Sequence, residues 1–427
     1  MLDIEIFRRN AAAVKESLKK RNLQDDGAVD RVVELDEKKR KLTVETDELR
    51  HRRKELSEKI GRMRKTGESV DSLVSEVHGI KERLDSYEEE LRKLEEEIQA
   101  TVLRIPNVLD EAVPEGKTSE ENKVIREWGE KRSFGFEVKP HYEIGAQLGI
   151  LDMERGAMIA GSHFPLFIGT GAALCRALIN FMLDTHTQNG YIEVSPPFVA
   201  NRVTMTGTGQ LPKFEEDMYR IDSDDFFLIP TAEVPLTSLH RDQILSFARL
   251  PLRYTSYTPC FRREAGAYGA KTRGLLRVHQ FDKVELMVYS APKQSPSEHE
   301  KILKDAENII QKLGLPYRVV LLCGGETGFS ARKCYDIELW APGVGQYLEV
   351  SSVSNFGDFQ ARRLNIRYRE PGGKVHFAHT LNGSGVALPR LIAAILENYQ
   401  NEDGSVTVPE VLRSYIRGLE RIVLPLA

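Results

Sequence analysis

The chain has 427 residues, 41% of them hydrophobic and 29% charged, a composition typical of a globular protein with more than one domain. Its formal net charge of −4 does not indicate a nucleic-acid-binding protein, so any contact with RNA requires a locally basic surface. The first residues lack the apolar core of a signal peptide, and no apolar run is long enough to span a bilayer, which predicts a cytoplasmic protein without a membrane partner. The four cysteines form no C-x-x-C pair, so we expect neither zinc nor a disulfide framework.

Two long helices are predicted for residues 30–105. Proline is absent from Asp30 to Ile105 and Pro106 ends that run, while residues 66–69 read as a turn. Apolar residues repeat every seven positions in both helices, from Leu35 to Met63 and from Val70 to Ile98. The pattern predicts an antiparallel coiled-coil hairpin about 50 Å long. We expect this hairpin to belong to an N-terminal arm of residues 1–107, which is followed by a second domain of residues 108–427.

The two helices of this hairpin differ in charge. Residues 31–65 hold 13 Lys/Arg against 8 Asp/Glu, whereas residues 66–100 hold 4 against 11. Basic side chains cluster in the first helix at Arg50, Arg52, Arg53 and Lys54, where they could meet phosphates. From the pattern alone, an ordinary solvated coiled-coil surface is the simpler explanation.

The middle of the chain contains shorter elements. A Pro/Gly-punctuated connector covers about residues 107–143, and a helix over 171–188 precedes a strand over 191–194. Residues 205–210 are expected to be mobile. A short strand at 226–230 ends at Thr231, which by pattern alone is more often a helix cap than a ligand contact.

The segment Phe261–Met287 reads as two strands joined by a polar loop, with turn glycines at 266, 269 and 274. Alternation predicts that Arg262 and Glu264 share one face, and that Arg277, Phe281 and Glu285 share a face of the partner strand. Guanidinium groups suit phosphates, a phenyl face suits a purine, and a carboxylate suits an amine. A solvated sheet edge is the alternative reading.

Two further segments offer ligands for a nucleotide. Strands at 336–340 and 346–354 are predicted to pair antiparallel, and residues 349–352 supply hard oxygen atoms of the kind that Mg²⁺ prefers. Residues 379–390 form a glycine-rich stretch before an apolar helix at 391–399, where Arg390 in the first turns can reach a triphosphate. Strict alternation places Glu349 and Ser352 on opposite faces of their strand.

These segments, in this order, resemble the three motifs of class II aminoacyl-tRNA synthetases, and among them the bacterial type of seryl-tRNA synthetase. Motif 2 is matched by FRREAG, TRGL and HQFDKVE, motif 1 by the helix, strand and Pro196-Pro197, and motif 3 by residues 379–390. The resemblance implies an α+β fold, in which an antiparallel sheet flanked by helices follows an N-terminal helical hairpin. It also implies a homodimer formed through motif 1.

The resemblance further implies a serine–tRNA ligase that uses ATP and Mg²⁺, forms AMP and pyrophosphate through a seryl-adenylate, and charges tRNA(Ser), with tRNA(Sec) as a further candidate. Its catalytic residues would be Arg262, Glu349 and Arg390. Its serine-binding residues would be Thr231, Ala232, Glu233, Arg262, Glu285, Asn382 and Ser384. Its ATP-binding residues would be Arg262, Arg263, Glu264, Arg277, Val278, Phe281, Glu349, Val350, Ser351, Ser352 and Arg390.

Within that set, Glu349 and Ser352 would hold the magnesium ion, which requires a bulge or an end of their strand. The arm would grip the long variable arm of the tRNA through Arg50, Arg52, Arg53 and Lys54. Pro389 departs from the family, which usually has glycine there, so the start of the last helix is expected to shift and to alter the reach of Arg390.

Two other readings remain open at this point. An amino-acid:carrier-protein ligase could share the adenylation core, although relatives of that kind lack a tRNA-binding arm. A non-catalytic coiled-coil scaffold would explain the hairpin but not three ordered nucleotide motifs.

Overall fold

The computed structural model describes residues 1–24, 27–264 and 273–424. The chain divides into two compact units: residues 1–19 with 23–108 form a helical unit, and residues 20–22 with 109–427 form a larger α+β unit. Within the described residues, no helix is both long and apolar enough to cross a bilayer.

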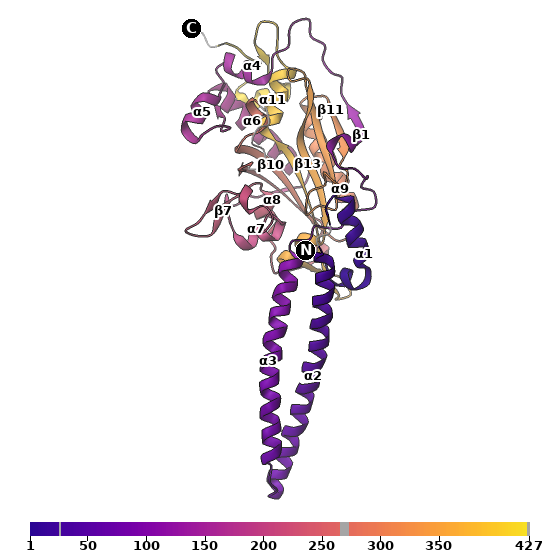
Figure 1. Cartoon of the computed structure of the whole chain (residues 1–427). Coiled ribbons are helices and arrows are strands. Elements are labelled where there is room, and N and C mark those ends of the chain that lie inside the picture. Colours follow the sequence, from indigo (N-terminus) through magenta and orange to yellow (C-terminus); the bar gives the residue numbers. More distant parts are fainter. Residues whose placement is uncertain (25–26, 265–272, 425–427) are drawn as a thin grey trace. The chain divides into compact units, whose positions relative to one another are not determined.

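The helical unit consists of α1 (Ile4–Lys20), α2 (Ala28–Thr66) and α3 (Asp71–Val102). Figure 1 shows α2 and α3 as an antiparallel pair. Gly67 ends α2 in the left-handed conformation with φ 77°, which a glycine adopts without strain. The predicted hairpin and its turn are confirmed.

The seam between α2 and α3 is apolar. Leu56, Ile80 and Leu84 are buried there, with Leu49, Leu73 and Val77 packed around them. Ion pairs flank this seam, among them Arg50–Glu88 at 3.0 Å and Arg52–Glu76 at 3.1 Å. Because both pairs are exposed to solvent, they contribute little to stability, and the apolar seam holds the helices together.

The α+β unit is built on an eight-stranded sheet whose neighbours pair antiparallel, except for β4 with β9. Its predicted antiparallel character is therefore confirmed. The strands, in spatial order, are β1 (Lys123–Trp128), β11 (Tyr317–Leu321), β12 (Lys333–Ala341), β13 (Gln346–Gly357), β16 (His379–Ala387), β10 (Gln280–Ser290), β9 (Leu252–Phe261) and β4 (Ile192–Glu193).

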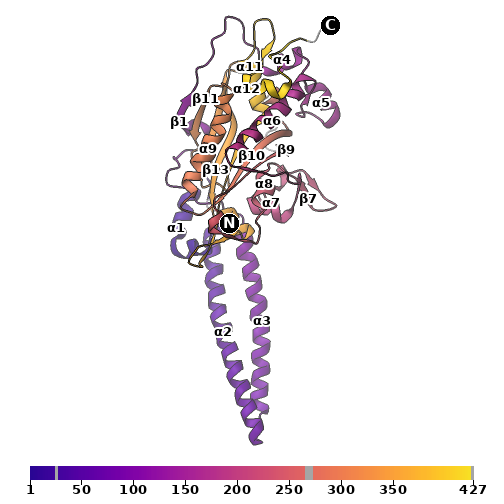
Figure 2. The same ribbon diagram turned by 180° about the vertical axis from the view of Figure 1, so that it is seen from behind.

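Three helices cover one face of this sheet: α6 (Thr170–Gln188), α9 (Ser295–Lys312) and α11 (Leu388–Asn398) (Figures 1 and 2). Their apolar side chains form one core with strand residues such as Val284, Leu286 and Val353. Since side chains alternate along a strand, Phe281, Lys283 and Glu285 of β10 point to the opposite face. Further along this face, Met287 and Tyr289 pack in a second apolar cluster, and the part around Phe281, Lys283 and Glu285 is left for polar groups.

Shorter elements complete the unit. The helices are α4 (His141–Gln147), α5 (Met153–Ala160), α7 (Arg202–Thr208), α8 (Glu233–Thr237), α10 (Phe359–Leu364) and α12 (Glu410–Arg413). The described residues also form four small sheets. Two of them have two strands each: β2 (Leu151–Asp152) with β3 (Leu166–Phe167), and β17 (Val406–Thr407) with β18 (Arg421–Ile422). The other two have three strands each, with β7 (Phe226–Leu228) between β5 (Val199–Asn201) and β6 (Arg220–Ile221), and β14 (Arg367–Arg369) between β8 (Ile244–Ser246) and β15 (Val375–Phe377).

Two segments hold more regular structure than the sequence predicted. Residues 205–208 lie in α7 and Gly209 caps it, so this segment is mostly helical, with Met205 fully buried. A Cβ on Gly207 would lie 2.3 Å from Leu364 Cδ2, so this glycine permits close packing. The connector at 107–143 also contains strand β1. An ion pair between Arg126 and Glu307 and the stacking of Trp128 on Tyr317 fix this strand to the sheet edge.

A fully buried pair, His141 and Glu397, ties distant segments of this unit together. The carboxylate of Glu397 accepts bonds from His141 Nδ1 at 2.7 Å, from the His141 backbone N–H, and from the N–H groups of Gly343 and Val344. His141 Nε2 accepts from the Leu275 N–H at 3.0 Å. One carboxylate therefore fixes α4, α11 and the β12–β13 turn, and its histidine fixes the segment before β10.

Glu397→Ala should lower the free energy of unfolding of the α+β unit by about 3 kcal/mol, because buried donors lose their acceptor. Urea denaturation followed by tryptophan fluorescence measures this, since both tryptophans, Trp128 and Trp340, lie in that unit. Glu402→Ala, an exposed carboxylate nearby in sequence, is the control. Equal midpoints for the two variants would contradict the assigned role.

Candidate active site

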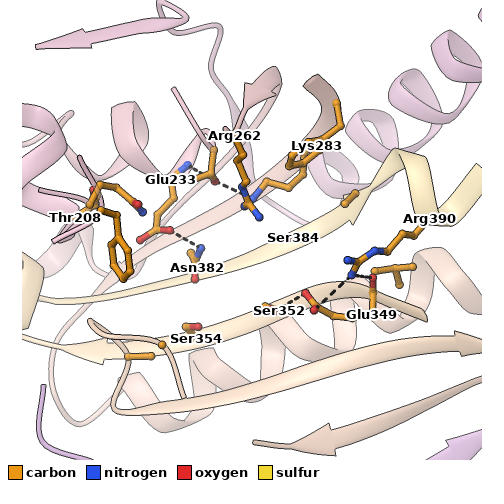
Figure 3. A pocket seen from close by; sticks show the side chains of 18 of the residues that line it. Thr208, Glu233, Arg262, Lys283, Glu349, Ser352, Ser354, Asn382, Ser384 and Arg390 are labelled. Atoms are coloured by element: carbon orange, nitrogen blue, oxygen red, sulfur yellow. Dashed lines mark hydrogen bonds and ion pairs between the residues drawn. The ribbon is translucent and has the colours of Figure 1, made fainter. Parts of the chain in front are cut away.

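A pocket of about 510 Å³ lies on the sheet face opposite α6, α9 and α11. It is formed by the segment after β9, the beginning of β10, the middle of β13 and of β16, the residues at the start of α8 and the start of α11. It brings together most of the predicted site residues: Thr231, Glu233, Arg262, Glu264, Arg277, Val278, Phe281, Glu349, Val350, Ser352, Asn382, Ser384 and Arg390. Figure 3 shows Thr208, Glu233 and Asn382 toward one end, and Glu349, Ser352 and Arg390 toward the other.

Four predicted residues do not line the pocket. Ala232 is fully buried at the start of α8, and Ser351 points its hydroxyl at the Ser384 carbonyl, 2.6 Å away. Arg263 is exposed, and its N–H donates to the Asp217 carbonyl. Glu285 is fully buried and is reached from the pocket only through its hydrogen-bond partners.

Strand alternation places Phe281 and Glu285, which lie in β10, but not Arg262, Glu264 and Arg277, which corrects that part of the sequence prediction. Strand β9 ends at Phe261, and Glu264 has φ 52°, so Arg262 and Glu264 lie in irregular backbone. Arg277 likewise precedes β10. Nevertheless, all three line the pocket. Of the three predicted turn glycines, Gly266 and Gly269 lie outside the described residues, and Gly274 has φ 66°.

The arginines have defined partners. The Arg262 guanidinium lies over the Phe281 ring, 5.1 Å from its centroid, which is a cation–π distance. Arg277 Nε and Nη2 both lie close to one carboxylate oxygen, Glu264 Oε2, at 2.7 and 2.5 Å. Arg390 donates to the carbonyls of Leu276 and Glu349 at 3.1 and 2.8 Å. Three guanidinium groups thus reach the same pocket.

One end of the pocket contains a buried polar cluster. Lys283 Nζ lies 2.5 Å from Glu285 Oε2 and 2.8 Å from Thr231 Oγ1. Asn382 Nδ2 donates to Glu285 Oε1 at 2.8 Å and to Glu233 Oε2 at 3.2 Å. Thr231 Oγ1 also accepts from the Glu233 N–H at 3.2 Å, so this side chain combines a capping contact with a place in the pocket wall.

The pKa of the Glu233 carboxyl group in this cluster is far from its ordinary value. Burial, and after it the charge of Glu285, raises the pKa of Glu233 to about 7. Gln360 Nε2 opposes this shift by donating to Glu233 Oε1 at 2.7 Å. The carboxyl group therefore changes its charge near neutral pH, where a bound cation would favour the ionised form.

Glu349 and Ser352 do face the same side of β13. Ile337 pairs with Ser351 and Glu338 pairs with Glu349, so Val350 is the extra residue of a β-bulge. The Ser352 hydroxyl lies 3.1 Å from Glu349 Oε1 and 2.6 Å from Asp336 Oδ1. Burial and then the charge of Glu349 raise the pKa of Asp336 well above its ordinary value. This oxygen-rich, negatively charged corner fits a hard divalent cation.

Pro389 does not disturb the last helix. Helix α11 starts at Leu388, earlier than the predicted Leu391, and Pro389 occupies its first turn, where proline needs no hydrogen-bond partner. Arg390 still lies in the pocket.

Several pocket residues were missed by the sequence analysis. Lys283 lies between Phe281 and Glu285 on the same strand face, so alternation alone could have identified it. The far wall, by contrast, consists of Thr208, Gln210, Phe214, Phe329 and Phe356, which come from separate segments without a shared pattern.

Comparisons with known proteins agree with this architecture. The family model of the seryl-tRNA synthetase N-terminal domain matches residues 1–109, and that of the class II tRNA synthetase core domain (G, H, P, S and T) matches residues 213–399. The serine–tRNA ligase of Pelotomaculum thermopropionicum is 52% identical, covering 99% of this chain and all of its own length. That of a Geobacillus species is 54% identical with the same coverage.

Solved structures show the same relationship. Seryl-tRNA synthetase from Pyrococcus horikoshii, complexed with ATP, superimposes with a TM-score of 0.95 at 40% identity, over all of both chains. The cytoplasmic serine–tRNA ligase of Naegleria fowleri, complexed with AMP, has a TM-score of 0.90 at 30% identity, over 100% of this chain and 99% of its own. With two family models matched in order and relatives above half identity along the whole length, the chain belongs to the seryl-tRNA synthetase family of class II aminoacyl-tRNA synthetases.

Proposed function

We propose that the protein is a serine–tRNA ligase that activates L-serine with ATP to seryl-adenylate and transfers the seryl group to the 3′ end of tRNA(Ser). The observation that carries this proposal is the pocket itself, with buried carboxylates at one end, Arg390 beside oxygen ligands toward the other, and Arg262 and Arg277 also in its lining. An amino acid and a triphosphate fit these two ends. The ligases and nucleotide complexes among the relatives support it.

In the first step, the serine carboxylate attacks the α-phosphorus of ATP and pyrophosphate leaves. A carboxylate is already a nucleophile, so this step needs alignment and neutralisation of charge more than a general base. Arg262 lies between the two ends of the pocket in Figure 3 and would clamp the α-phosphate. In the second step, a hydroxyl at the tRNA 3′ end attacks the acyl carbon and AMP leaves.

Other groups would hold the nucleotide. Arg277 and Arg390 would contact the outer phosphates, Phe281 would stack on the adenine, and Glu264 would read the adenine edge. Binding of phosphates by Arg277 competes with its present pairing to Glu264. Val278 and Val350 add apolar contacts from the pocket wall, while Arg263 and Ser351 would act only from beside it.

Glu349 and Ser352 would hold Mg²⁺, since the bulge at Val350 turns both oxygen ligands to one side. The ion would withdraw charge from the phosphate oxygens.

Serine would bind at the other end. Glu233 and Glu285, with Thr231, Asn382 and Ser384, would satisfy its ammonium and hydroxyl groups. A site that bonds a hydroxyl group rejects alanine, because its own polar groups would otherwise be buried unpaired.

The arm would bind the tRNA. Arg50 and Arg52 pair with acids of α3, whereas Arg53 and Lys54 are exposed, and no ion pair among the described residues involves either. We further propose tRNA(Sec) as a second substrate and a homodimer built through the α6 and β4 region. Aminoacylation of unfractionated tRNA with each amino acid in turn tests the whole assignment, and charging with an amino acid other than serine would refute it.

Arg262→Ala should lower serine-dependent ATP–pyrophosphate exchange by roughly 30- to 1000-fold, because losing a desolvated charge partner costs about 2–4 kcal/mol of transition-state binding. Glu285→Ala should act mainly on the KM for serine. Arg369→Ala, an exposed arginine of the same unit, is the matched control. Exchange at the control rate in Arg262→Ala would exclude the α-phosphate clamp.

The KM for serine should depend on pH through Glu233. Its pKa is raised from 4.5 to about 7, so between those values the folded enzyme keeps a proton that an ammonium ligand must displace. As pH rises from 6 to 8, the KM should fall about tenfold and then level off. Glu233→Gln should bind serine more weakly and lose this dependence. An unchanged pH profile in that variant would assign the titration to another group.

Arg53→Glu combined with Lys54→Glu should raise the KM for tRNA several-fold and leave that for serine unchanged, because the change adds negative charge only to the arm. Aminoacylation and exchange assays on the same preparation separate the two effects. Lys81→Glu with Arg83→Glu makes the same change of charge on α3 and should have less effect.

Deletion of residues 30–103, closed by a short flexible linker, extends the test of the arm. Serine activation should stay within about tenfold of the intact enzyme, while tRNA charging collapses. Charging at the intact rate by this variant would contradict a role of the arm in tRNA binding.

A further inference from the structure

The connection between β11 and β12 forms one end wall of the pocket. Its residues 328–331 line the cavity, next to Thr208 and Phe214. The Ser330 hydroxyl donates to the Thr208 carbonyl at 2.8 Å, and the Phe329 ring packs edge-on against Phe214. The position of this wall therefore sets the shape of the pocket at that end.

A single guanidinium group holds the backbone of this wall. Arg21 Nη1 donates to the carbonyls of Thr327 and Gly328 at 2.8 and 3.1 Å, and Nη2 donates to that of Ala331 at 2.5 Å. Only 5% of the surface of Arg21 is exposed. Burial lowers its pKa to about 10, so the group still carries its charge at neutral pH.

A guanidinium group is well suited to hold several backbone carbonyls at once. The guanidinium group is planar and presents several N–H groups in fixed directions, so it can bridge carbonyls that a lysine ammonium would reach only in part. A buried charge is costly unless its donors are used, and here three carbonyl dipoles accept from them. The arginine and the wall thus stabilise each other.

The chain also packs closely at Lys20, the residue before Arg21. A Cβ on Gly324 would lie only 2.1 Å from the Lys20 carbonyl oxygen, so this position requires glycine. In agreement, residues 20–22 belong to the compact α+β unit, although the N-terminal family model extends over residues 1–109.

Hydrogen bonds continue from the wall to the buried carboxylate at the proposed serine end. The Thr208 carbonyl, which accepts from Ser330, also accepts from Gln360 Nε2 at 3.4 Å. Gln360 Nε2 donates to Glu233 Oε1 at 2.7 Å, and Thr380 fixes the amide from its other side. Among the described residues, the hydrogen bonds of Arg390 and Glu349, at the other end, involve neither this wall nor Gln360.

We infer that Arg21 is a positioning residue for the serine end of the pocket, which acts by fixing residues 327–331 and, through Thr208 and Gln360, the carboxylate of Glu233. The inference rests on the proposed function, since it assigns serine to that end. Residues 20–22 contribute no atom to the pocket lining. The inference nevertheless makes this segment a determinant of amino-acid affinity.

The test uses the full-length enzyme with Arg21→Ala. The KM for serine in ATP–pyrophosphate exchange should rise about tenfold or more, whereas the KM for ATP changes less than about threefold. Added ethylguanidinium should restore part of the serine affinity. Hydrogen exchange of the amides at 327–331 should become faster. Arg9→Ala, an arginine that is 81% exposed, is the control and should change none of these values.

Two further variants keep the test decisive if Arg21→Ala folds poorly. Arg21→Lys keeps the charge but not the fork, and should show an intermediate KM for serine. Gly324→Ala places a Cβ against the Lys20 carbonyl and should give the same selective loss, while Gly135→Ala, whose added Cβ meets nothing within 4 Å, should not.

The outcomes are separable. If the wild-type enzyme does not use serine, the proposed function fails. If it does, and Arg21→Lys and Gly324→Ala keep the wild-type KM for serine, or change both KM values equally, Arg21 does not position the serine end.

Discussion

Two carboxylates buried side by side impose the strictest constraint on this fold. Glu285 is fully buried and Glu233 is 8% exposed, and both lie on the polar face of the sheet. Taking such groups out of water costs several kcal/mol each unless hydrogen bonds and an opposite charge replace the lost hydration. Lys283 supplies that charge, and Thr231, Asn382 and Gln360 supply the donors. Strands β10 and β16, the start of α8 and helix α10 must therefore meet at one place.

Register shifts in the sheet adapt regular strands to this task. The bulge at Val350 turns Glu349 and Ser352 to one side. Between β10 and β16 a second shift leaves Gly385 without a partner, and its carbonyl accepts from the buried His186 instead. The face covered by helices stays apolar, because regular alternation persists through Val284, Leu286 and Val353. Polar chemistry is thus confined to one face without loss of the core.

Local patterns predicted the features that depend on local physics. Seven-residue spacing and proline distribution identified α2 and α3, and alternation identified β10, β12 and β13. The motif resemblance grouped residues that the pocket does bring together, although their roles remain proposals. Features that depend on partners distant in sequence were not predicted. The end of β9 at Phe261, the burial of α7 and the contact of Arg21 with residues 327–331 all arise from tertiary packing. A bulge likewise leaves no trace in hydrophobic periodicity.

The pair of His141 and Glu397 has a consequence for how the protein is made. The two residues are separated by 256 positions, and the backbone groups of Gly343 and Val344 complete the same set of bonds. During synthesis, the α+β unit cannot close this set until almost the whole chain has left the ribosome. The hairpin of α2 and α3 depends on contacts between neighbouring segments and can form much earlier. Until Glu397 emerges, the strands already synthesised expose apolar faces and unpaired edges, and this interval is when the nascent chain is most prone to aggregate.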